Sequence, residues 1–331
     1  MSRYVVTGCA GFVGSHLTDA LVGAGHEVLG VDALSDYYDP KLKRANLADA
    51  LRSDAFSLVE GDLLELPVES LFAGADGVFH LAAQPGVRGS WGASFATYVR
   101  DNIVASQRVF EVAAKAGVRC VWTSSSSIYG NAAAYPTRED ARPEPISPYG
   151  VTKLACEHLA DAHRTAFAIN HVVLRFFTIY GPRQRPDMAF TRLLGALVGG
   201  TPFHVYGTGE QSRDVTYVAD AVTAMVAAMD GAPAGAVFNV GGGTEATLSD
   251  VIALAEELTG RQLDARYERA MEGDVRRTSA DTTLIRGELG WQPSADLRSG
   301  LDAQLAWVKR VRVNAPEVGE RDRSSHSSIH E

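Results

Sequence analysis

The sequence has few cysteines, no long hydrophobic run and no excess of positive charge. Its three cysteines, Cys9, Cys120 and Cys156, stand far apart among 331 residues, so a disulfide framework is not expected. No apolar segment approaches the ~20 residues of a membrane span, and no apolar signal core follows Met1. The net charge of −9 leaves no basic stripe for phosphate groups. We therefore expect a cytoplasmic protein that binds small soluble ligands rather than nucleic acid or a membrane.

What the first half of the chain does contain is an alternation of strand and helix patterns. Strand patterns cover residues 4–6, 28–31, 56–59, 78–82, 118–123 and 171–176. Helical patterns begin near residue 12, run through residue 47, cover 94–115 and follow Pro148. Because each crossover helix must cover one face of a sheet, this alternation predicts an α/β fold with a Rossmann-like, doubly wound parallel sheet. Ligands should bind at the carboxyl ends of its strands.

After residue 182 the alternation loosens, which suggests a smaller C-terminal lobe that binds substrate. Strand patterns remain at 203–206 and 236–240, and helical patterns at 218–229, 248–258 and 297–311. We expect residues 1–178, with 214–242 returning to them, to form the larger domain, and 179–213 with 243–312 to form the lobe. From about Asn314 the hydrophobic period is lost, so residues 313–331 read as a disordered tail.

A glycine-rich turn follows the first strand and opens a helix, with the sequence TGCAGFVG over residues 7–14. Glycines there allow a pyrophosphate to approach backbone N–H groups at the helix N-terminus, although a plain strand-to-helix turn is the alternative. Asp32 ends the second strand and could accept both hydroxyls of an adenosine ribose. Since residues 33–36 include no Lys or Arg, the pattern predicts NAD rather than NADP.

Further cofactor contacts are expected after the third and fourth strands. Asp62 would meet adenine, or would cap a helix N-terminus. His80 is expected to be a packed core histidine, and no metal site is predicted. The predicted cofactor-binding residues are Gly8, Gly11, Phe12, Val13, Gly14, Asp32, Asp62, Leu63, Leu81, Ala82, Ala83, Tyr149 and Lys153.

Tyr149 and Lys153 stand four residues apart at a helix start, so their side chains project from one face. An ammonium ion near a phenol favours the phenolate, which makes Tyr149 a usable base. Lys153 could also bind the nicotinamide ribose. Such a pair occurs by chance on many helices, but here it comes after a dinucleotide turn and a strand that ends in Ser124 to Ser127.

Six motifs together resemble the extended short-chain dehydrogenases/reductases that act on nucleotide sugars. They are TGCAGFVG, HLAAQ, TSSSSIYG, SPYGVTK, RFFTIYGPRQRPDMA and GTGEQSRDVTYVADA, and the resemblance covers residues 3 to about 311. It implies tightly held NAD, a two-lobed fold, and a homodimer formed through the two long helices. It also implies catalytic roles for Ser125, Tyr149 and Lys153, which would remove hydride from sugar C4 and leave a 4-keto intermediate.

The serine run indicates the fate of that intermediate. By the resemblance, relatives that dehydrate their substrate carry Asp and Glu at the positions of Ser126 and Ser127. Relatives that decarboxylate glucuronate typically carry Glu at the position of Ser127. Serine hydroxyls hold groups by hydrogen bonds but do not readily abstract a C5 proton, so we expect hydride return to the other face and C4 epimerisation. The alternative for these serines is capping of backbone groups at the strand end.

Residues 36–40, the serine run and residues 183–189 resemble UDP-glucuronate 4-epimerases more than the UDP-glucose kind. The hydroxyls of Ser126, Ser127 and Thr178, with Arg185, would bind the sugar carboxylate. Arg213 would either contact the UDP diphosphate or face solvent. Arg276 is a second phosphate candidate with which Arg277 competes, and Asn102 would brace the tyrosine helix or face the surface. The predicted substrate-binding residues are Val87, Arg88, Ser126, Ser127, Thr178, Arg185, Arg213 and Arg276.

Three other functions stay open on the sequence alone. A UDP-glucose 4-epimerase and a UDP-glucuronate decarboxylase would use the same oxidation at C4. A catalytically silent protein that senses NAD could use the same fold, because fold alone does not determine function.

Overall fold

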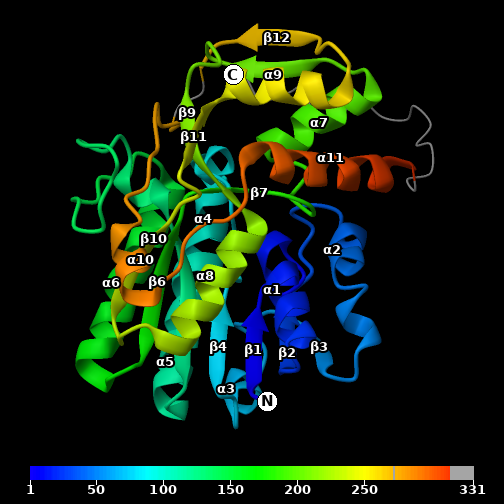
Figure 1. The fold of residues 1–331 in the computed structure, drawn as a ribbon. Coiled ribbons are helices and arrows are strands. Elements are labelled where there is room, and N and C mark those ends of the chain that lie inside the picture. The colour runs from blue at the N-terminus through cyan, green and yellow to red at the C-terminus, as the bar shows by residue number, and fades with distance from the viewer. Residues whose placement is uncertain (271–272, 314–331) are drawn as a thin grey trace.

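The computed structural model of the protein describes residues 1–270 and 273–313. Its centre is a seven-stranded sheet in the order β10-β6-β5-β4-β1-β2-β3, in which every neighbouring pair is parallel (Figure 1). The strands are β1 (Arg3–Thr7), β2 (Glu27–Asp32), β3 (Phe56–Glu60), β4 (Gly77–His80), β5 (Arg119–Ser125), β6 (His171–Phe176) and β10 (Ala236–Val240). The predicted Rossmann-like parallel sheet is therefore confirmed, and the strand order reverses beside β1, where a ligand crevice is expected.

Helices cover both faces of this sheet. One core cluster joins it to α1 (Phe12–Gly23), α8 (Val218–Gly231) and α10 (Thr283–Leu289). The other joins it to α3 (Val68–Phe72), α5 (Ala105–Ala116) and α6 (Pro148–Phe167). Val6 packs in the first cluster and its neighbour Val5 in the second, as alternation along a strand requires. Within the described ranges, no helix combines the length and apolarity needed to cross a bilayer.

Three boundaries differ from the sequence prediction. The fourth strand ends at His80 instead of residue 82, because the following residues turn away towards the cofactor crevice. The strand predicted over 118–123 continues through Ser125, since β6 still pairs with it there. The helix predicted over 94–115 consists of α4 (Phe95–Tyr98), a π-helical turn η4 (Val99–Val104) and α5. Such turns are frequent at functional sites.

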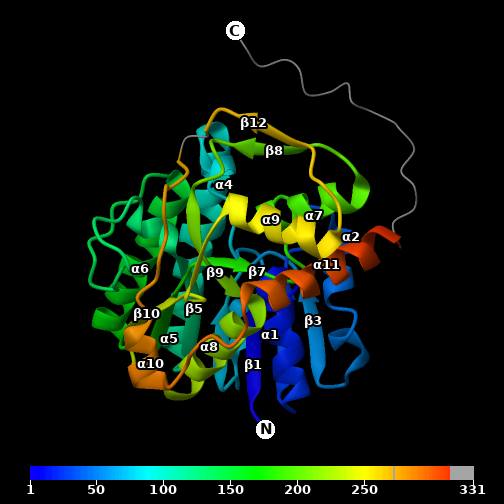
Figure 2. The ribbon, with the colours of Figure 1, turned by 45° about the horizontal axis from the view of Figure 1, so that its top comes forward.

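The second lobe lies above the carboxyl ends of the large sheet (Figures 1 and 2). It contains a three-stranded sheet of β7 (Thr178–Tyr180), β9 (Ser212–Tyr217) and β11 (Thr244–Thr247), and a pair of β8 (Phe203–Tyr206) and β12 (Ala265–Glu268). Its core is closed by α7 (Ala189–Gly199), α9 (Leu248–Thr259) and α11 (Leu297–Val313). The predicted tail began at residue 313, which is the last residue of α11, and its remaining residues, 314–331, lie outside the described residues.

One buried carboxylate connects this lobe to α8. Asp220, in the first turn of α8, is 3% exposed. Its Oδ1 accepts hydrogen bonds from Ser294 N and Oγ at 3.0 and 2.8 Å, and its Oδ2 accepts one from Ala295 N at 3.1 Å. Because residues 290–296 lead from α10 to α11, these bonds fix the point where α11 enters the lobe.

We expect Asp220→Ala to lower the free energy of unfolding by about 1–3 kcal/mol, because it removes a buried carboxylate that accepts three hydrogen bonds from Ser294 and Ala295. Urea denaturation followed by circular dichroism measures the change. Asp230→Ala, at the exposed end of the same helix, is the control and should change the midpoint little. Equal midpoints for the two variants would contradict this role of Asp220.

Candidate active site

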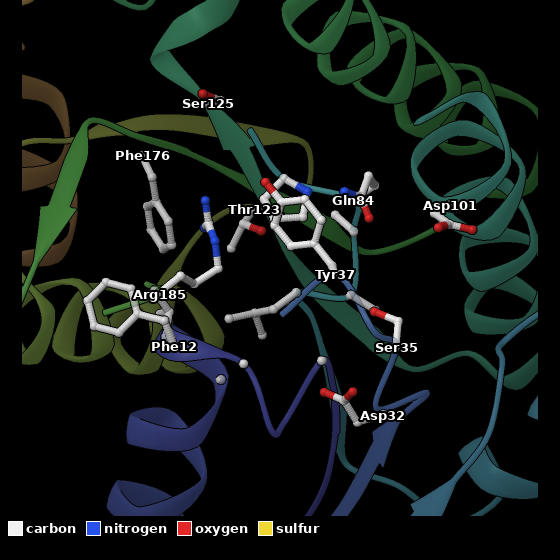
Figure 3. A pocket seen from close by; sticks show the side chains of 18 of the residues that line it. Phe12, Asp32, Ser35, Tyr37, Gln84, Asp101, Thr123, Ser125, Phe176 and Arg185 are labelled. Atoms are coloured by element: carbon white, nitrogen blue, oxygen red, sulfur yellow. The ribbon is translucent and has the colours of Figure 1, made fainter. Parts of the chain in front are cut away.

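Two cavities open at the carboxyl edge of the large sheet and meet at three hydroxyls. The larger has a volume of about 440 Å³ and the smaller about 160 Å³. Ser126, Ser127 and Thr178 line both cavities. All the residues predicted to bind the cofactor line the larger one, as does Ser125, and Figure 3 shows Asp32 and Ser125 on opposite sides of it.

The glycine turn packs closely against the protein backbone at the N-terminus of α1, where only glycine fits. A Cβ on Gly14 would stand 2.1 Å from the Gly8 carbonyl oxygen, and one on Gly8, whose φ is +72°, 2.7 Å from Ala82 N. Gly11 occupies the N-cap and offers no side-chain acceptor. The first N–H groups of α1 therefore lack an intrahelical partner and face the cavity, which suits a pyrophosphate.

Asp32 is held at the end of β2 by two backbone donors. Its Oδ2 accepts from Ala10 N at 3.0 Å and its Oδ1 from Leu34 N at 2.8 Å. A carboxylate offers about four lone-pair sites, so capacity remains for the two hydroxyls of a ribose.

Lys43 also lines the cavity, and the sequence prediction missed it. The prediction considered cations only among residues 33–36, but α2 (Pro40–Asn46) turns the chain back. Lys43 Nζ donates to Ser35 O at 2.8 Å and to Ser35 Oγ at 3.0 Å. Asp39-Pro40, a helix N-cap and first residue, is the signal that could have indicated this return.

Asp62 and His80 are both engaged in local structure. Asp62 Oδ1 accepts from Leu64 N at 2.8 Å, so it caps a single turn ahead of α3 and not α3 itself. His80 is confirmed as a packed core histidine, with Nδ1 2.7 Å from Thr7 Oγ1 and Nε2 3.0 Å from Ser106 Oγ. Burial, with the Lys153 charge, lowers the pKa of His80 to about 3, so this ring is neutral at neutral pH.

The four serines divide between a strand and a short helix. Ser124 and Ser125 end β5, and Ser126 and Ser127 open the 3-10 helix η5 (Ser126–Tyr129). Ser125 Oγ accepts from Ser127 N and donates to Ser127 Oγ, both at 3.1 Å. The capping alternative therefore describes Ser125 and not Ser124, whose Oγ donates to the Glu157 carboxylate at 2.5 Å.

Tyr149 and Lys153 both reach the larger cavity from the first turns of α6. Ser147 caps this helix by accepting from Gly150 N at 3.1 Å, and Pro148 takes the first position, where a missing N–H costs nothing. Lys153 is 7% exposed, and its Nζ donates to Thr123 O at 2.9 Å. The helix and the end of β5 are thereby joined at the site.

Asn102 braces the tyrosine helix from the π-helical turn. It is 1% exposed, so the surface-facing alternative is wrong. Its Nδ2 donates to Thr152 Oγ1 at 3.0 Å and to Gln84 O at 3.1 Å, and its Oδ1 accepts from Gln84 N at 2.7 Å. The loop after β4 and α6 are thus fixed relative to each other.

Arg185 enters the larger cavity from the loop before α7, near the ring of Tyr37 (Figure 3). Its Nε and Nη2 donate to the two carboxylate oxygens of Asp187, each at 3.0 Å. The same loop is anchored on α1, because Arg183 Nη1 donates to Asp19 Oδ2 at 2.7 Å.

The structure separates the candidates for the smaller cavity into two groups. Val87 and Arg213 line it, and Arg213 Nη1 donates to Ser212 O at 2.8 Å. Arg88 is not among its lining residues; it pairs with Asp274 at 2.7 Å. Arg276 is exposed outside both cavities.

Arg277, which competed with Arg276 in the prediction, is occupied. Its Nε and Nη2 donate to the Glu245 carboxylate at 2.6 and 2.8 Å. Neither Arg276 nor Arg277 lines a cavity, so the structure gives the predicted phosphate contact of Arg276 no support.

The carboxylates that line the two cavities in residues 1–270 and 273–313 already have partners. They are Asp32, Asp62, Asp101 and Asp274. Backbone N–H groups hold Asp32, Arg100 pairs with both Asp62 and Asp101, and Arg88 pairs with Asp274. The groups that surround the junction of the cavities are therefore hydroxyls, a phenol and cations.

This combination of a parallel sheet, a glycine turn and a Tyr–Lys pair defines a dinucleotide-binding protein with an oxidoreductase-like site. Residues 4–241 match the profile of the NAD dependent epimerase/dehydratase family, and the chain belongs to this family.

Relatives with names and solved structures cover nearly the whole chain. An uncharacterized UDP-glucose epimerase of Bacillus subtilis, YtcB, is 39% identical over 93% of this chain and 98% of its own. A UDP-glucuronate 4-epimerase of Thermodesulfobacterium geofontis is 33% identical over 93% and 97%. The crystal structure of UDP-glucuronic acid 4-epimerase from Bacillus cereus, with UDP-glucuronic acid and NAD, is 37% identical, covers 93% and 99%, and has a TM-score of 0.91.

We expect Gly14→Ala to weaken NAD binding about tenfold or more, because its Cβ cannot stand 2.1 Å from Gly8 O without moving the turn. The absorbance of nucleotide released from the purified protein measures the bound fraction. Gly23→Ala is the matched control on the same helix, since a Cβ there meets nothing within 4 Å. Wild-type NAD content in Gly14→Ala would show that the turn does not carry the cofactor.

Proposed function

We propose that the protein is an NAD-dependent UDP-glucuronate 4-epimerase, which interconverts UDP-glucuronate and UDP-galacturonate through a 4-keto sugar. The observation that carries this proposal is the hydroxyl cluster of Ser126, Ser127 and Thr178 where the two cavities meet. The larger cavity would hold NAD, and the smaller would take the UDP portion beside Arg213. A sugar between them would lie against the cluster. The names of the relatives support the same activity.

The chain supplies proton transfer and orientation for this reaction. Bound NAD would accept the C4 hydride and later return it. Tyr149 would take the proton of the C4 hydroxyl, and Ser125 would hydrogen-bond the C4 oxygen. Lys153, fixed on Thr123 O, would favour the phenolate of Tyr149 and bind the nicotinamide ribose. The 4-keto sugar would then rotate in the site and present its other face to the cofactor for return of the hydride. Its C4 oxygen would take the proton back from Tyr149.

The hydroxyl cluster would also protect the intermediate. With C4 oxidised, the hexuronate is a β-keto acid, which loses its carboxylate readily when that bond aligns with the carbonyl π system. Hydrogen bonds from Ser126, Ser127 and Thr178, closed by Arg185, would fix the carboxylate away from this alignment. Charge-assisted bonds of this kind contribute about 1.5–3 kcal/mol each.

UDP-glucose 4-epimerase is the second candidate, because the Bacillus subtilis relative bears that name and the hydroxyls could also hold a neutral hydroxymethyl group. Decarboxylation is less favoured, since the described carboxylates of the cavities are all partnered. A silent NAD-binding protein would not need Ser125, Tyr149 and Lys153 gathered at one cavity.

We further propose that the protein acts in the cytoplasm as a homodimer. The resemblance implies pairing through α5 and α6, which pack against each other in one chain. Val104 and Val151, at the starts of these helices, are 45% and 46% exposed and would be covered by such a partner.

We expect the purified protein to convert UDP-glucuronate to UDP-galacturonate, separated by anion-exchange chromatography. Tyr149→Phe should lower kcat by about 10²–10⁴-fold, because it removes the base but keeps the ring. UDP-glucose is the parallel substrate. Faster epimerisation of UDP-glucose would favour the second candidate, pentose as the main product would indicate a decarboxylase, and no turnover of either sugar would contradict an epimerase.

We expect Ser127→Ala to raise the UDP-pentose product several-fold relative to epimer, because one bond that orients the carboxylate is lost. The ratio of the two products in one incubation measures the effect. Ser127→Thr keeps a hydroxyl and should keep the wild-type ratio. An unchanged ratio in Ser127→Ala would remove the support for carboxylate holding.

A further inference from the structure

A buried ion pair lies directly behind the residues that would carry out the reaction. Glu157 is on α6, one helical turn after Lys153 and two after Tyr149. Arg175 is on β6, where it is the register partner of Ser124. The two side chains are each 8% exposed, and Arg175 Nε and Nη2 donate to Glu157 Oε1 and Oε2 at 3.1 and 2.7 Å. Burying such a pair is costly unless its remaining groups are also satisfied.

The remaining groups of the pair are satisfied by neighbouring elements. Ser124 Oγ donates to Glu157 Oε1 at 2.5 Å. Arg175 Nη1 donates to Tyr129 Oη at 2.7 Å and to Glu139 O at 2.8 Å. Burial would lower the pKa of Arg175, but hydrogen bonding to Glu157 and its charge raise it overall. The Glu157 carboxyl oxygens accept three hydrogen bonds in all, two of them from the guanidinium, so the two side chains form a closed ion pair of opposite charges.

The pair is connected to the catalytic groups through the end of β5. Lys153 Nζ donates to Thr123 O, and the next residue, Ser124, donates to Glu157. Two successive residues of β5 thus hold two successive turns of α6. This explains why the serine run begins one residue before Ser125: the hydroxyl of Ser124 serves Glu157.

Two further titratable side chains beside Lys153, His80 and Cys156, are uncharged at neutral pH. Burial lowers the pKa of His80 on β4 and raises that of the Cys156 thiol on α6. On the far side of Arg175, burial raises the pKa of Tyr129 to about 12, and burial also raises the pKa of the Glu139 carboxyl.

The groups that face Tyr149 from other elements are one phenol and one cation. Tyr98 of α4 lies with its ring edge towards Tyr149, at 6.3 Å between centroids, and burial raises its pKa. Arg185, before α7, lines the same cavity as Tyr149, but its guanidinium is bound to Asp187. Lys153 is thus the cation near Tyr149, among the described residues, for which no carboxylate partner is found.

We propose that Glu157 and Arg175 are positioning residues, whose mutual neutralisation leaves Lys153 to set the charge felt by Tyr149. The inference rests on the proposed function only in taking Tyr149 as the base. Eight helical residues span about 12 Å. At that distance and an effective dielectric constant of about 20, one unbalanced charge moves a proton equilibrium by up to about one pH unit.

The test uses two variants, each of which replaces one charged side chain of the pair by an uncharged one. Their expected effects on the pH dependence of kcat have opposite directions. Glu157→Gln leaves the Arg175 charge unbalanced, which favours the phenolate, so the acid limb of kcat should move down by about half to one pH unit. Arg175→Met leaves Glu157 unbalanced, so the limb should move up by a similar amount. The double variant should return the acid limb to within about 0.2 pH unit of its wild-type position, because both charges are gone. Initial rates of epimerisation over a pH series provide the measurement.

Shifts of the acid limb in opposite directions in the two single variants support the inference. Shifts in the same direction, or no shift in either variant, overturn it. Should Arg175→Met fail to fold, Glu157→Gln and the double variant decide. An acid limb of kcat in Glu157→Gln at the same pH as in the wild type would then overturn the inference. Asp220→Asn, which weakens the hydrogen bonds to Ser294 and Ala295 away from both cavities, is the control and should lower the melting temperature without moving the limb. Retained turnover in Tyr149→Phe would instead count against the proposed function.

Discussion

The hydrogen bond from Lys153 Nζ to Thr123 O is the contact on which the site depends. It ties the helix that carries Tyr149 to the strand that ends in Ser125, so base and hydroxyl are positioned by elements of regular structure and not by loops. The sheet order places this strand end next to β4 and, beyond it, β1, whose glycine turn opens the cofactor cavity. One edge of one sheet therefore gathers the residues that we propose bind the cofactor, transfer the proton and bind the substrate.

Much of this arrangement can be predicted from local sequence patterns. The strand–helix alternation predicted the parallel sheet, and the glycine turn, Asp32 and the Tyr149–Lys153 spacing predicted residues that do line one cavity. These predictions succeed because each depends on short-range geometry: a strand end, a helix N-terminus, or one face of a helix.

The features that the sequence did not predict depend on contacts between distant segments. Lys43 reaches Ser35 only because α2 turns back, and Glu157 finds Arg175 only because β6 lies beside β5. The small strands of the second lobe, such as β11 with its sequence TEAT, have little hydrophobic content of their own. They pair because their neighbours offer a sheet edge, which no local pattern reveals.

The anchor between Arg183 and Asp19 has a consequence for how substrates exchange. The loop that carries Arg185 is fastened to the same helix whose N-terminus faces the cofactor cavity. In a reaction that hands the same hydride back, every turnover regenerates the oxidised cofactor and nothing is consumed. Under the proposed function, sugars would therefore exchange at the smaller cavity while the nucleotide stays bound in the larger one, so the protein would need no second enzyme to reoxidise its coenzyme.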